Sequence, residues 1–242
     1  MAIQTVFKRY ELKYILTQDQ KNQLLQAMAP YMALDRYGRT TIRNIYFDTD
    51  TYLLIRRSIE KPEYKEKLRI RSYEKAGAQD IVFVELKKKY QHVVYKRRVT
   101  LPESEAMDWL CGTQDDKSGT QISEEVNYFL QYYRTLHPTV FLSYEREAFY
   151  SSDGSDFRVT FDENILCRED NISLGAAIYG MPLLQEGTTL MEIKCSGGIP
   201  MWMAQFLSAN GIYKTSFSKY GTAYEKMIYP KLYRTKENMH YA

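Results

Sequence analysis

The chain of 242 residues has the length of one sizeable domain, and 44% of its residues are hydrophobic, as in ordinary globular proteins. Its 33 Lys and Arg nearly balance its 30 Asp and Glu, so the net charge of +3 predicts no general nucleic-acid affinity. Three widely spaced cysteines favour reduced thiols over a disulfide framework, and three histidines without ligand spacing argue against a zinc site.

The amino-terminal residues 1–14 are polar and lack the apolar core of a signal peptide. No later stretch approaches the roughly 18 consecutive apolar residues of a membrane span. We therefore expect a cytoplasmic protein with no membrane span in this chain, and the sequence identifies no membrane partner.

The predicted elements are mainly strand pairs with helices inserted between them. A strand at 9–14 precedes a helix that begins after Thr17, where Gln20 completes a capping box, and ends near Pro30. Residues 50–57 form a short helical or extended piece. Further strands are expected at 40–47, 67–73, 81–89, 91–101, 139–150, 157–168 and 190–195, and further helices at 102–110, 122–136, 200–209 and around 220–228. About eight strands and five helices in this order predict an α+β fold, an antiparallel eight-stranded β-barrel with covering helices.

The hairpin over 67–89 has the clearest pattern in the sequence. Successive side chains leave a strand on opposite faces, so the charged residues of both strands share one face and apolar residues such as Leu68 and Leu86 take the other. The charged face comprises Lys67, Arg69, Arg71, Glu85, Lys87 and Lys89. An open sheet would expose this face to water.

The same alternation recurs in other strands, with more cations than carboxylates. The groups that share a face are Arg9, Glu11 and Lys13; Lys96 and Arg98; Tyr144 and Arg146; Arg158, Thr160 and Asp162; and Glu192 and Lys194. A sheet closed into a barrel would turn these cations inward, where like charges require a polyanion or counter-ions. The repetition favours a barrel over a solvated sheet.

Eight short segments carry a resemblance to a known family. They are Glu11-Leu12-Lys13, Tyr46-Phe47-Asp48-Thr49, Leu68-Arg69-Ile70-Arg71, Val84-Glu85-Leu86-Lys87, Ser143-Tyr144-Glu145-Arg146, Phe157-Arg158-Val159, Met191-Glu192-Ile193-Lys194 and Ser216-Phe217-Ser218-Lys219-Tyr220. In this order they resemble the triphosphate tunnel metalloenzymes, and within them the vacuolar transporter chaperone (VTC) branch of polyphosphate polymerases. The resemblance implies one tunnel domain over residues 1–242, with a core at about 5–229 and a polar C-terminal tail.

The resemblance implies a tunnel whose lumen holds a triphosphate or polyphosphate chain. The cations expected to line it and to act in catalysis are Lys13, Arg69, Arg71, Lys87, Lys96, Arg146, Arg158 and Lys219. Arg98, Lys194, Ser216 and Ser218 would add phosphate contacts. Glu192 would hold the divalent metal, Mn²⁺ or Mg²⁺, with Glu11 and Glu85 as helpers.

In the resembled polymerases, the γ-phosphate of ATP passes to a growing inorganic polyphosphate chain and ADP leaves. ATP and polyphosphate are therefore the expected partners, with no specific nucleic acid. Two alternatives stay open: a triphosphatase or other hydrolase of the same fold, and a non-catalytic polyanion-binding module. Arg9 stands where the hydrolytic branch usually has the first Glu of a Glu-x-Glu-x-Lys strand, which favours chain binding over water activation. We find no counterpart of the inositol-phosphate-sensing domain or membrane spans of fungal VTC complexes, so their regulation and export are not carried over.

Other charged residues are expected to serve outside the tunnel. Arg43 and Arg97 are predicted to be exterior salt-bridge partners. Glu145, Glu147 and Glu163 are predicted to be surface ion-pairing groups, each worth little to stability.

Overall fold

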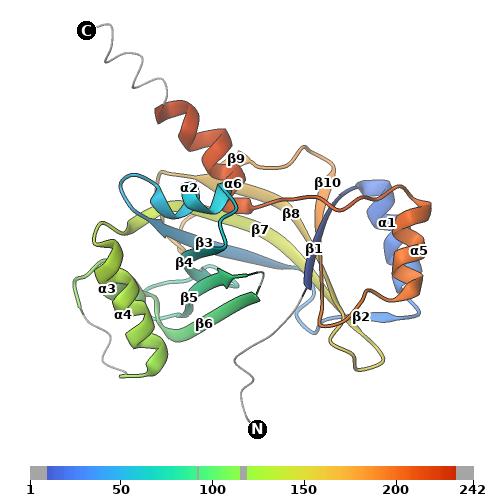
Figure 1. Ribbon diagram of the computed structural model, residues 1–242, viewed down its shortest axis with the longest axis horizontal. Coiled ribbons are helices and arrows are strands. Elements are labelled where there is room, and N and C mark those ends of the chain that lie inside the picture. The colour runs from blue at the N-terminus through green and yellow to red at the C-terminus, as the bar shows by residue number, and fades with distance from the viewer. Residues whose placement is uncertain (1–9, 92, 115–118, 233–242) are drawn as a thin grey trace, which may run out of the picture.

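The computed structural model describes residues 10–91, 93–114 and 119–232, so the predicted contribution of Arg9 lies outside the described residues. Ten strands form one antiparallel sheet, with helices packed around it (Figure 1). The strands are β1 Tyr10–Thr17, β2 Met32–Leu34, β3 Thr40–Asp48, β4 Tyr64–Ser72, β5 Ile81–Tyr90, β6 Val93–Pro102, β7 His137–Ser151, β8 Arg158–Arg168, β9 Met181–Pro182 and β10 Thr188–Cys195. The helices are α1 Gln18–Met28, α2 Leu53–Ile59, α3 Glu103–Leu110, α4 Gln121–Tyr133, α5 Met201–Ala209 and α6 Lys219–Ala223, which continues into the π-helix η1 Tyr224–Ile228.

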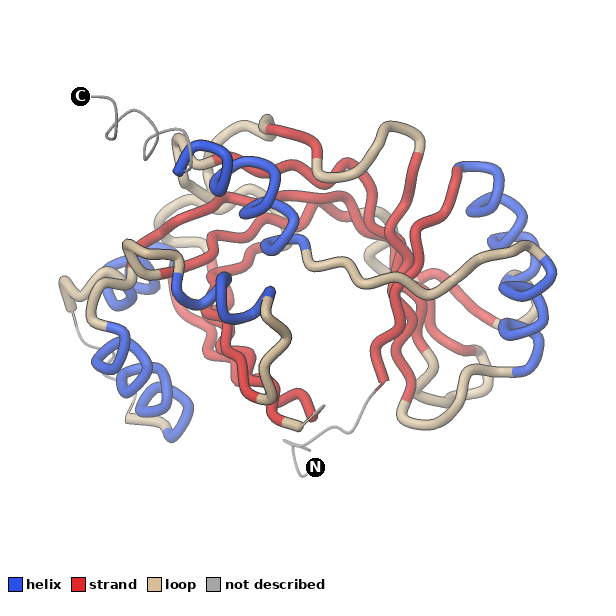
Figure 2. Tube along the Cα trace, turned by 45° about the horizontal axis from the view of Figure 1, so that its top comes forward, coloured by secondary structure: helices blue, strands red, loops and turns tan. Residues whose placement is uncertain are grey.

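The sheet is curved but its hydrogen-bonded path is open. Eight strands follow the order β1-β10-β8-β7-β3-β4-β5-β6, while β2 pairs with β7 and β9 pairs with β8. The path ends at β1 and β6, and no ladder joins these two strands within the described residues, so the barrel closure that we expected is not shown. Figure 2 shows the strands curving around a central space, with the segment between α5 and α6 running across it. A bridge between Lys13 and Thr215 places that segment along β1.

Strand alternation decides which side chains face the central space. On β4, Leu68 and Ile70 are fully buried in a core that includes Trp109 of α3 and Phe129 of α4. On β10, Met191 and Ile193 belong to a second core, which they share with apolar residues of α1 and α5. Because helices cover the outer face, the charged residues between these apolar positions point inward.

Asp48, the last residue of β3, anchors α2 and α6. The side chain of Asp48 is fully buried and accepts hydrogen bonds from the backbone amides of Thr49, Leu54 and Ile55. It also accepts a hydrogen bond of 2.9 Å from the hydroxyl of Tyr220, on α6. Sequence segments about 170 residues apart are thereby joined at one carboxylate.

Most predicted elements are confirmed, with a few differences. The capping box of Thr17 and Gln20 is present at the start of α1. The two shortest strands, β2 and β9, were not predicted, since two or three residues give no periodicity. The piece at 50–57 contains the start of α2.

The outer charged residues behave partly as predicted. Arg97 pairs with Glu125 of α4, with their closest nitrogen and oxygen 3.1 Å apart. Glu145, Glu147 and Glu163 form the predicted ion pairs, with Lys21 and Arg39, but the pair of Glu163 with the buried Lys21 is not the surface contact that we expected. The prediction for Arg43 was wrong, because this buried guanidinium donates to the carbonyl oxygens of Leu174 and Ala176 instead of forming a salt bridge.

Each described helix is too short, or not apolar enough, to cross a lipid bilayer.

Candidate phosphate-binding site

The register of β4, β5 and β6 arranges charged residues in rows across the inner face of the sheet. Arg69 lies opposite Glu85, and Glu85 opposite Arg98, so one row has a carboxylate between two guanidinium groups. The next row toward the strand ends contains Lys67, Lys87 and Lys96, three ammonium groups with no carboxylate among them. Like charges directly opposite each other in a sheet are destabilising unless an anion lies between them.

Four cations converge on the carboxylate of Glu85, whose side chain is 1% exposed. Arg69 donates to it through Nε at 2.9 Å and Nη2 at 2.7 Å, and the Nζ of Lys96 lies 2.7 Å from the other oxygen. Arg98 also pairs with it, and Arg71 approaches to 3.9 Å. Burial raises the pKa of Glu85, but these cations outweigh it and hold the pKa well below the usual range. Glu85 therefore holds several cations in place around the central space.

A second carboxylate pair gathers cations on the opposite wall. Asp162, fully buried on β8, accepts a bidentate pair of hydrogen bonds from Arg146 at 2.5 and 2.6 Å, and its Oδ2 lies 2.5 Å from the Nζ of Lys219. Glu192 on β10 lies 3.1 Å from the same ammonium and 3.5 Å from that of Lys194. Burial opposes ionisation of Glu192, but Lys219 and the neighbouring cations keep its pKa well below the ordinary value.

Lys13 joins the carboxylates of Glu11 and Glu192. Its Nζ lies 3.2 Å from Glu11 and 3.6 Å from Glu192, and it donates to the carbonyl oxygen of Phe217 at 2.8 Å. Glu11 also lies 3.6 Å from the Nζ of Lys87 on β5, so an ion pair joins β1, at one end of the sheet path, to the strand next to its other end. Burial raises the pKa of Glu11, yet Lys87 and the other cations lower it to about 2.

The donor set of Glu11 and Glu192 fits a hard divalent cation. The two carboxylates already share one cation, the ammonium of Lys13. Among the described residues no three His, Cys, Asp or Glu side chains form a metal-binding group, so phosphate oxygens and water would complete the coordination. Glu85 fits less well, because Arg69 and Lys96 hold its two oxygens at 2.7 Å, whereas the cations around Glu11 and Glu192 lie 3.1 to 3.6 Å away.

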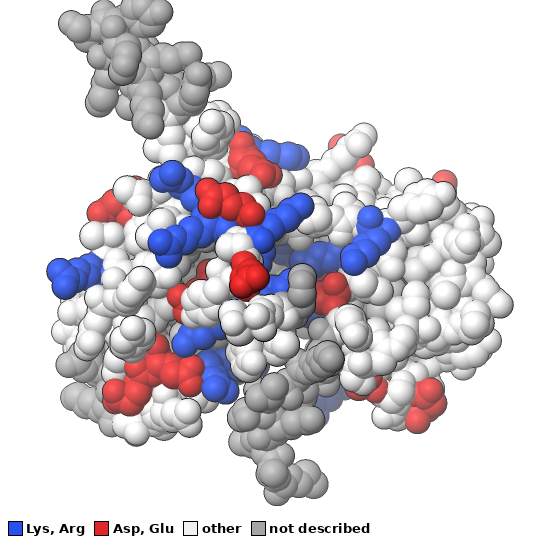
Figure 3. All heavy atoms as spheres, in the orientation of Figure 1, with Lys and Arg blue, Asp and Glu red and all other residues white. Residues whose placement is uncertain are grey.

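These charges surround what we term the inner cavity, with a volume of about 350 Å³. The predicted residues that line it are Glu11, Lys13, Arg69, Arg71, Glu85, Lys87, Lys96, Arg146, Arg158, Glu192, Lys194, Ser218 and Lys219. Ser216 lines a second space next to it, and Arg98 is not among the lining residues but pairs with Glu85. Figure 3 shows Lys and Arg gathered around the middle of this face of the molecule.

The lining cations differ in how well they are paired. Arg71 is buried and donates to the side chains of Asn44 and Tyr144, so it also supports the wall. Arg158 stacks on Tyr150, 4.6 Å from the ring centroid, and its buried Nε has no hydrogen-bond partner in the structure.

Sequence reasoning missed Asp162 and Lys67 as site residues, although it placed both on charged faces. Lys67 lines the inner cavity, and its Nζ donates to the hydroxyl of Ser218 at 3.0 Å. Asp162 forms ion pairs with Arg146 and Lys219, and no sequence motif marks it as a site residue. The alternation of Arg158, Thr160 and Asp162 was the one available signal for it.

The chain is similar to one protein family and to several solved structures. A family model described as the VTC domain matches residues 8–228. The search of curated proteins found no match. Among solved structures, the chain is similar to a protein of Bacillus halodurans described as a candidate adenylate cyclase, with a TM-score of 0.54, 17% identity, and coverage of 88% of this chain and 95% of that chain.

A second similar structure is HpAC1 from Hippeastrum, described as a candidate adenylyl cyclase with a dominant triphosphatase activity. Its TM-score is 0.55 at 15% identity, and the match covers 87% of this chain and 92% of that chain. At such low identities these two structures support the fold alone.

Proposed function

Because the chain belongs to the VTC domain family, we propose that it transfers the γ-phosphate of ATP to the end of a growing inorganic polyphosphate chain in the inner cavity. A terminal oxygen of the chain bonds to the γ-phosphorus while the bond from that phosphorus to the bridging oxygen of ADP breaks. Such a reaction depends mainly on positioning the phosphates and neutralising their oxygens.

The cations of both walls would supply this neutralisation. Arg69 and Arg146 offer planar groups held by buried carboxylates, and Arg158 has an unpartnered nitrogen. Glu192 and Glu11 are the residues that would hold Mn²⁺ or Mg²⁺, and the metal would withdraw charge from the phosphate oxygens.

One observation supports phosphate transfer rather than hydrolysis. The four described carboxylates around the inner cavity, those of Glu11, Glu85, Asp162 and Glu192, are all ion-paired. The pKa values of Glu11, Glu85, Asp162 and Glu192 all lie below their ordinary values, since neighbouring cations outweigh the effect of burial. A carboxylate that takes a proton from water works best with a pKa near the working pH. A phosphate oxygen needs no such base, so the ion pairing disfavours a carboxylate as the base for water and is compatible with the phosphate acceptor that we propose.

The variant Glu192→Gln tests this proposal. We expect its turnover of ATP to fall about 100-fold or more, while its affinity for tripolyphosphate changes less than about threefold. Calorimetric titration of Mn²⁺ into the protein with bound tripolyphosphate should show weaker metal binding. Arg69→Ala serves as the contrast, because it should weaken tripolyphosphate binding directly. Full turnover in Glu192→Gln would contradict the assigned role of Glu192.

A further inference from the structure

Two helices on the outer face of β1 and β10, α1 and α5, pack side by side and come from segments that are almost free of charge (Figure 1). Residues 196–213 include no Asp, Glu, Lys or Arg, and residues 18–34 include only Asp19 and Lys21, although 26% of the whole chain is charged. Lys21 is buried, where it pairs with Glu147 and Glu163. Asp19 is therefore the one exposed charged residue in these two segments, both of which the structure describes throughout.

The exposed side of the two helices carries amide and apolar side chains instead. We term it the neutral face, and its residues are Asn22, Gln23, Gln26, Tyr31, Met201 and Gln205. Met201 is 71% exposed, and the exposed Tyr31 stacks on Trp202 with ring centroids 4.6 Å apart. Figure 3 shows this end of the molecule, on the right, with few charged side chains, in contrast to the middle.

This composition is typical of a contact between proteins. The core of such a contact is depleted of charged residues and enriched in Met and aromatic residues. A helix that faces only water usually carries charged residues on its outer side. The packing of α1 and α5 on the sheet does not require their outer sides to be neutral, so the neutral face needs another explanation.

The amide side chains favour a second copy of this chain over a lipid surface. In a symmetric dimer the same face of both copies comes together, so a charged residue would meet like charges. Amide groups both donate and accept hydrogen bonds, so Asn22, Gln23 and Gln26 can pair with the amides of an identical face. A helix that binds a membrane surface instead presents Lys and Arg to anionic headgroups, and the neutral face includes neither.

We propose that the neutral face is the contact between two copies of this chain in a symmetric dimer. The 11 residues of α1 and the 9 of α5 span about 16 and 14 Å, so the contact is small, and we expect a weak dimer with a Kd of about 10 to 100 µM.

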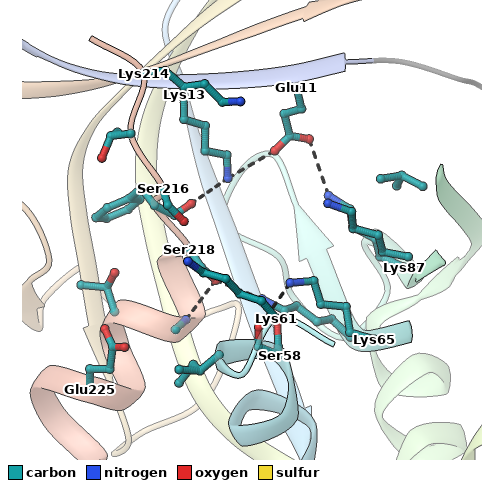
Figure 4. A pocket seen from close by; sticks show the side chains of 18 residues that line it. Glu11, Lys13, Ser58, Lys61, Lys65, Lys87, Lys214, Ser216, Ser218 and Glu225 are labelled. Atoms are coloured by element: carbon teal, nitrogen blue, oxygen red, sulfur yellow. Dashed lines mark hydrogen bonds and ion pairs between the residues drawn. The ribbon is translucent and has the colours of Figure 1, made fainter. Parts of the chain in front are cut away.

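The dimer does not depend on the proposed function. No residue of the neutral face lines the inner cavity or the second space next to it. Charged residues resume at Lys214, which is one of the residues that line the second space (Figure 4). The dimer therefore covers no residue that lines either space.

The test compares two double variants of the full chain that add equal charge at exposed glutamines. Gln23→Lys/Gln205→Lys places two lysines on the neutral face, and Gln79→Lys/Gln185→Lys places two lysines elsewhere on the surface. Sedimentation velocity over protein concentrations of about 1 to 500 µM gives the Kd of the dimer, at low and at high salt. Thermal melting checks that both variants stay folded.

The unmodified protein should form a dimer whose Kd changes less than about threefold between low and high salt, because no ion pair contributes to the contact. In Gln23→Lys/Gln205→Lys the added charges of the two copies repel each other, so the Kd should rise about tenfold or more at low salt and less at high salt. The control variant should form the dimer as the unmodified protein does.

Three results would overturn the inference: a protein that stays monomeric throughout the concentration range, equal weakening of the dimer in both variants, or a dimer that high salt dissociates. Flotation with phosphatidylcholine vesicles tests the other occupant. A monomer that binds these vesicles, and binds them less in Gln23→Lys/Gln205→Lys than in the control variant, would assign the neutral face to a lipid surface instead.

Discussion

Asp162 illustrates how one buried carboxylate organises two cations of the inner cavity. It does not line the cavity itself, but it contacts Arg146 and Lys219, which do. Burial raises the pKa of Asp162, but Arg146 and Lys219 outweigh it and keep the group ionised. Asp162 is therefore a positioning residue, acting on phosphate through its two partners.

We predict that Asp162→Asn separates catalysis from binding. The variant keeps the size of the side chain but removes its charge, so Arg146 and Lys219 lose their fixed orientation. Its kcat should fall about tenfold while KM for ATP changes less than about threefold. Stability should also fall by about 3 to 5 kcal/mol, since a buried ion pair loses one partner.

The matched control is Glu163→Gln, at the next position on β8. Glu163 points to the outer face and pairs with Lys21 and Arg39, so its loss should lower the melting temperature without changing kcat. An equal loss of kcat in both variants would show that Asp162 acts through stability alone.

The ionisation of Lys67 should make the binding of long-chain polyphosphate depend on pH. Burial and the cations that face it, Lys87, Lys13, Lys65 and Arg69, lower its pKa to about 7. The amine is protonated below that pH and neutral above it, and only the protonated form attracts phosphate. Affinity for long-chain polyphosphate should therefore fall about threefold to fivefold between about pH 6 and pH 8. In Lys67→Met the pH profile should be flatter, and an unchanged profile would refute the assignment to Lys67.

At the scale of elements, Asp48 fixes the helices at one end of the inner cavity. Tyr220, which donates to Asp48, also stacks on Tyr46, with ring centroids 4.8 Å apart. The position of Lys219 follows from that of Tyr220, because the two residues are adjacent on α6. Asp48 thus connects the fold of β3 with the placement of a cavity cation.

We predict that Asp48→Ala destabilises the protein by about 3 kcal/mol, because it leaves three buried amides and one hydroxyl without their acceptor. Denaturant unfolding measures this change. Thr17→Ala, which removes the cap of α1, should cost only about 1 kcal/mol. Equal losses in the two variants would contradict the central role of Asp48.

The sequence predicted the long elements better than the contacts between them. The alternation in β4 and β5 identified the inner face correctly, because Leu68 and Leu86 are fully buried on the other side. The prediction for Arg43 failed because the carbonyl groups that surround its guanidinium belong to Leu174 and Ala176, about 130 residues away, and the sequence near Arg43 gives no sign of them. The anchoring of Tyr220 by Asp48 also had no local signal, since it joins distant segments.

At the scale of the whole molecule, the curved sheet brings two groups of cations into one space. Alternation predicted which residues point inward, but not which carboxylate each cation would meet. Glu85 was expected to assist a metal, whereas its contacts make it the partner of Arg69 and Lys96. Pairing across strands depends on register and side-chain reach, and neither is encoded in the period of a single strand.

The most direct test of polyphosphate synthesis is to incubate the protein with ATP and Mn²⁺ or Mg²⁺. The products are resolved on a gel that separates polyphosphate by length, and ADP and free phosphate are quantified in the same samples. We predict a polyphosphate ladder, with ADP formed in step with the phosphate incorporated and little free phosphate. Free phosphate without a ladder would contradict the account in favour of a hydrolase, and the absence of both products would leave a polyanion-binding module.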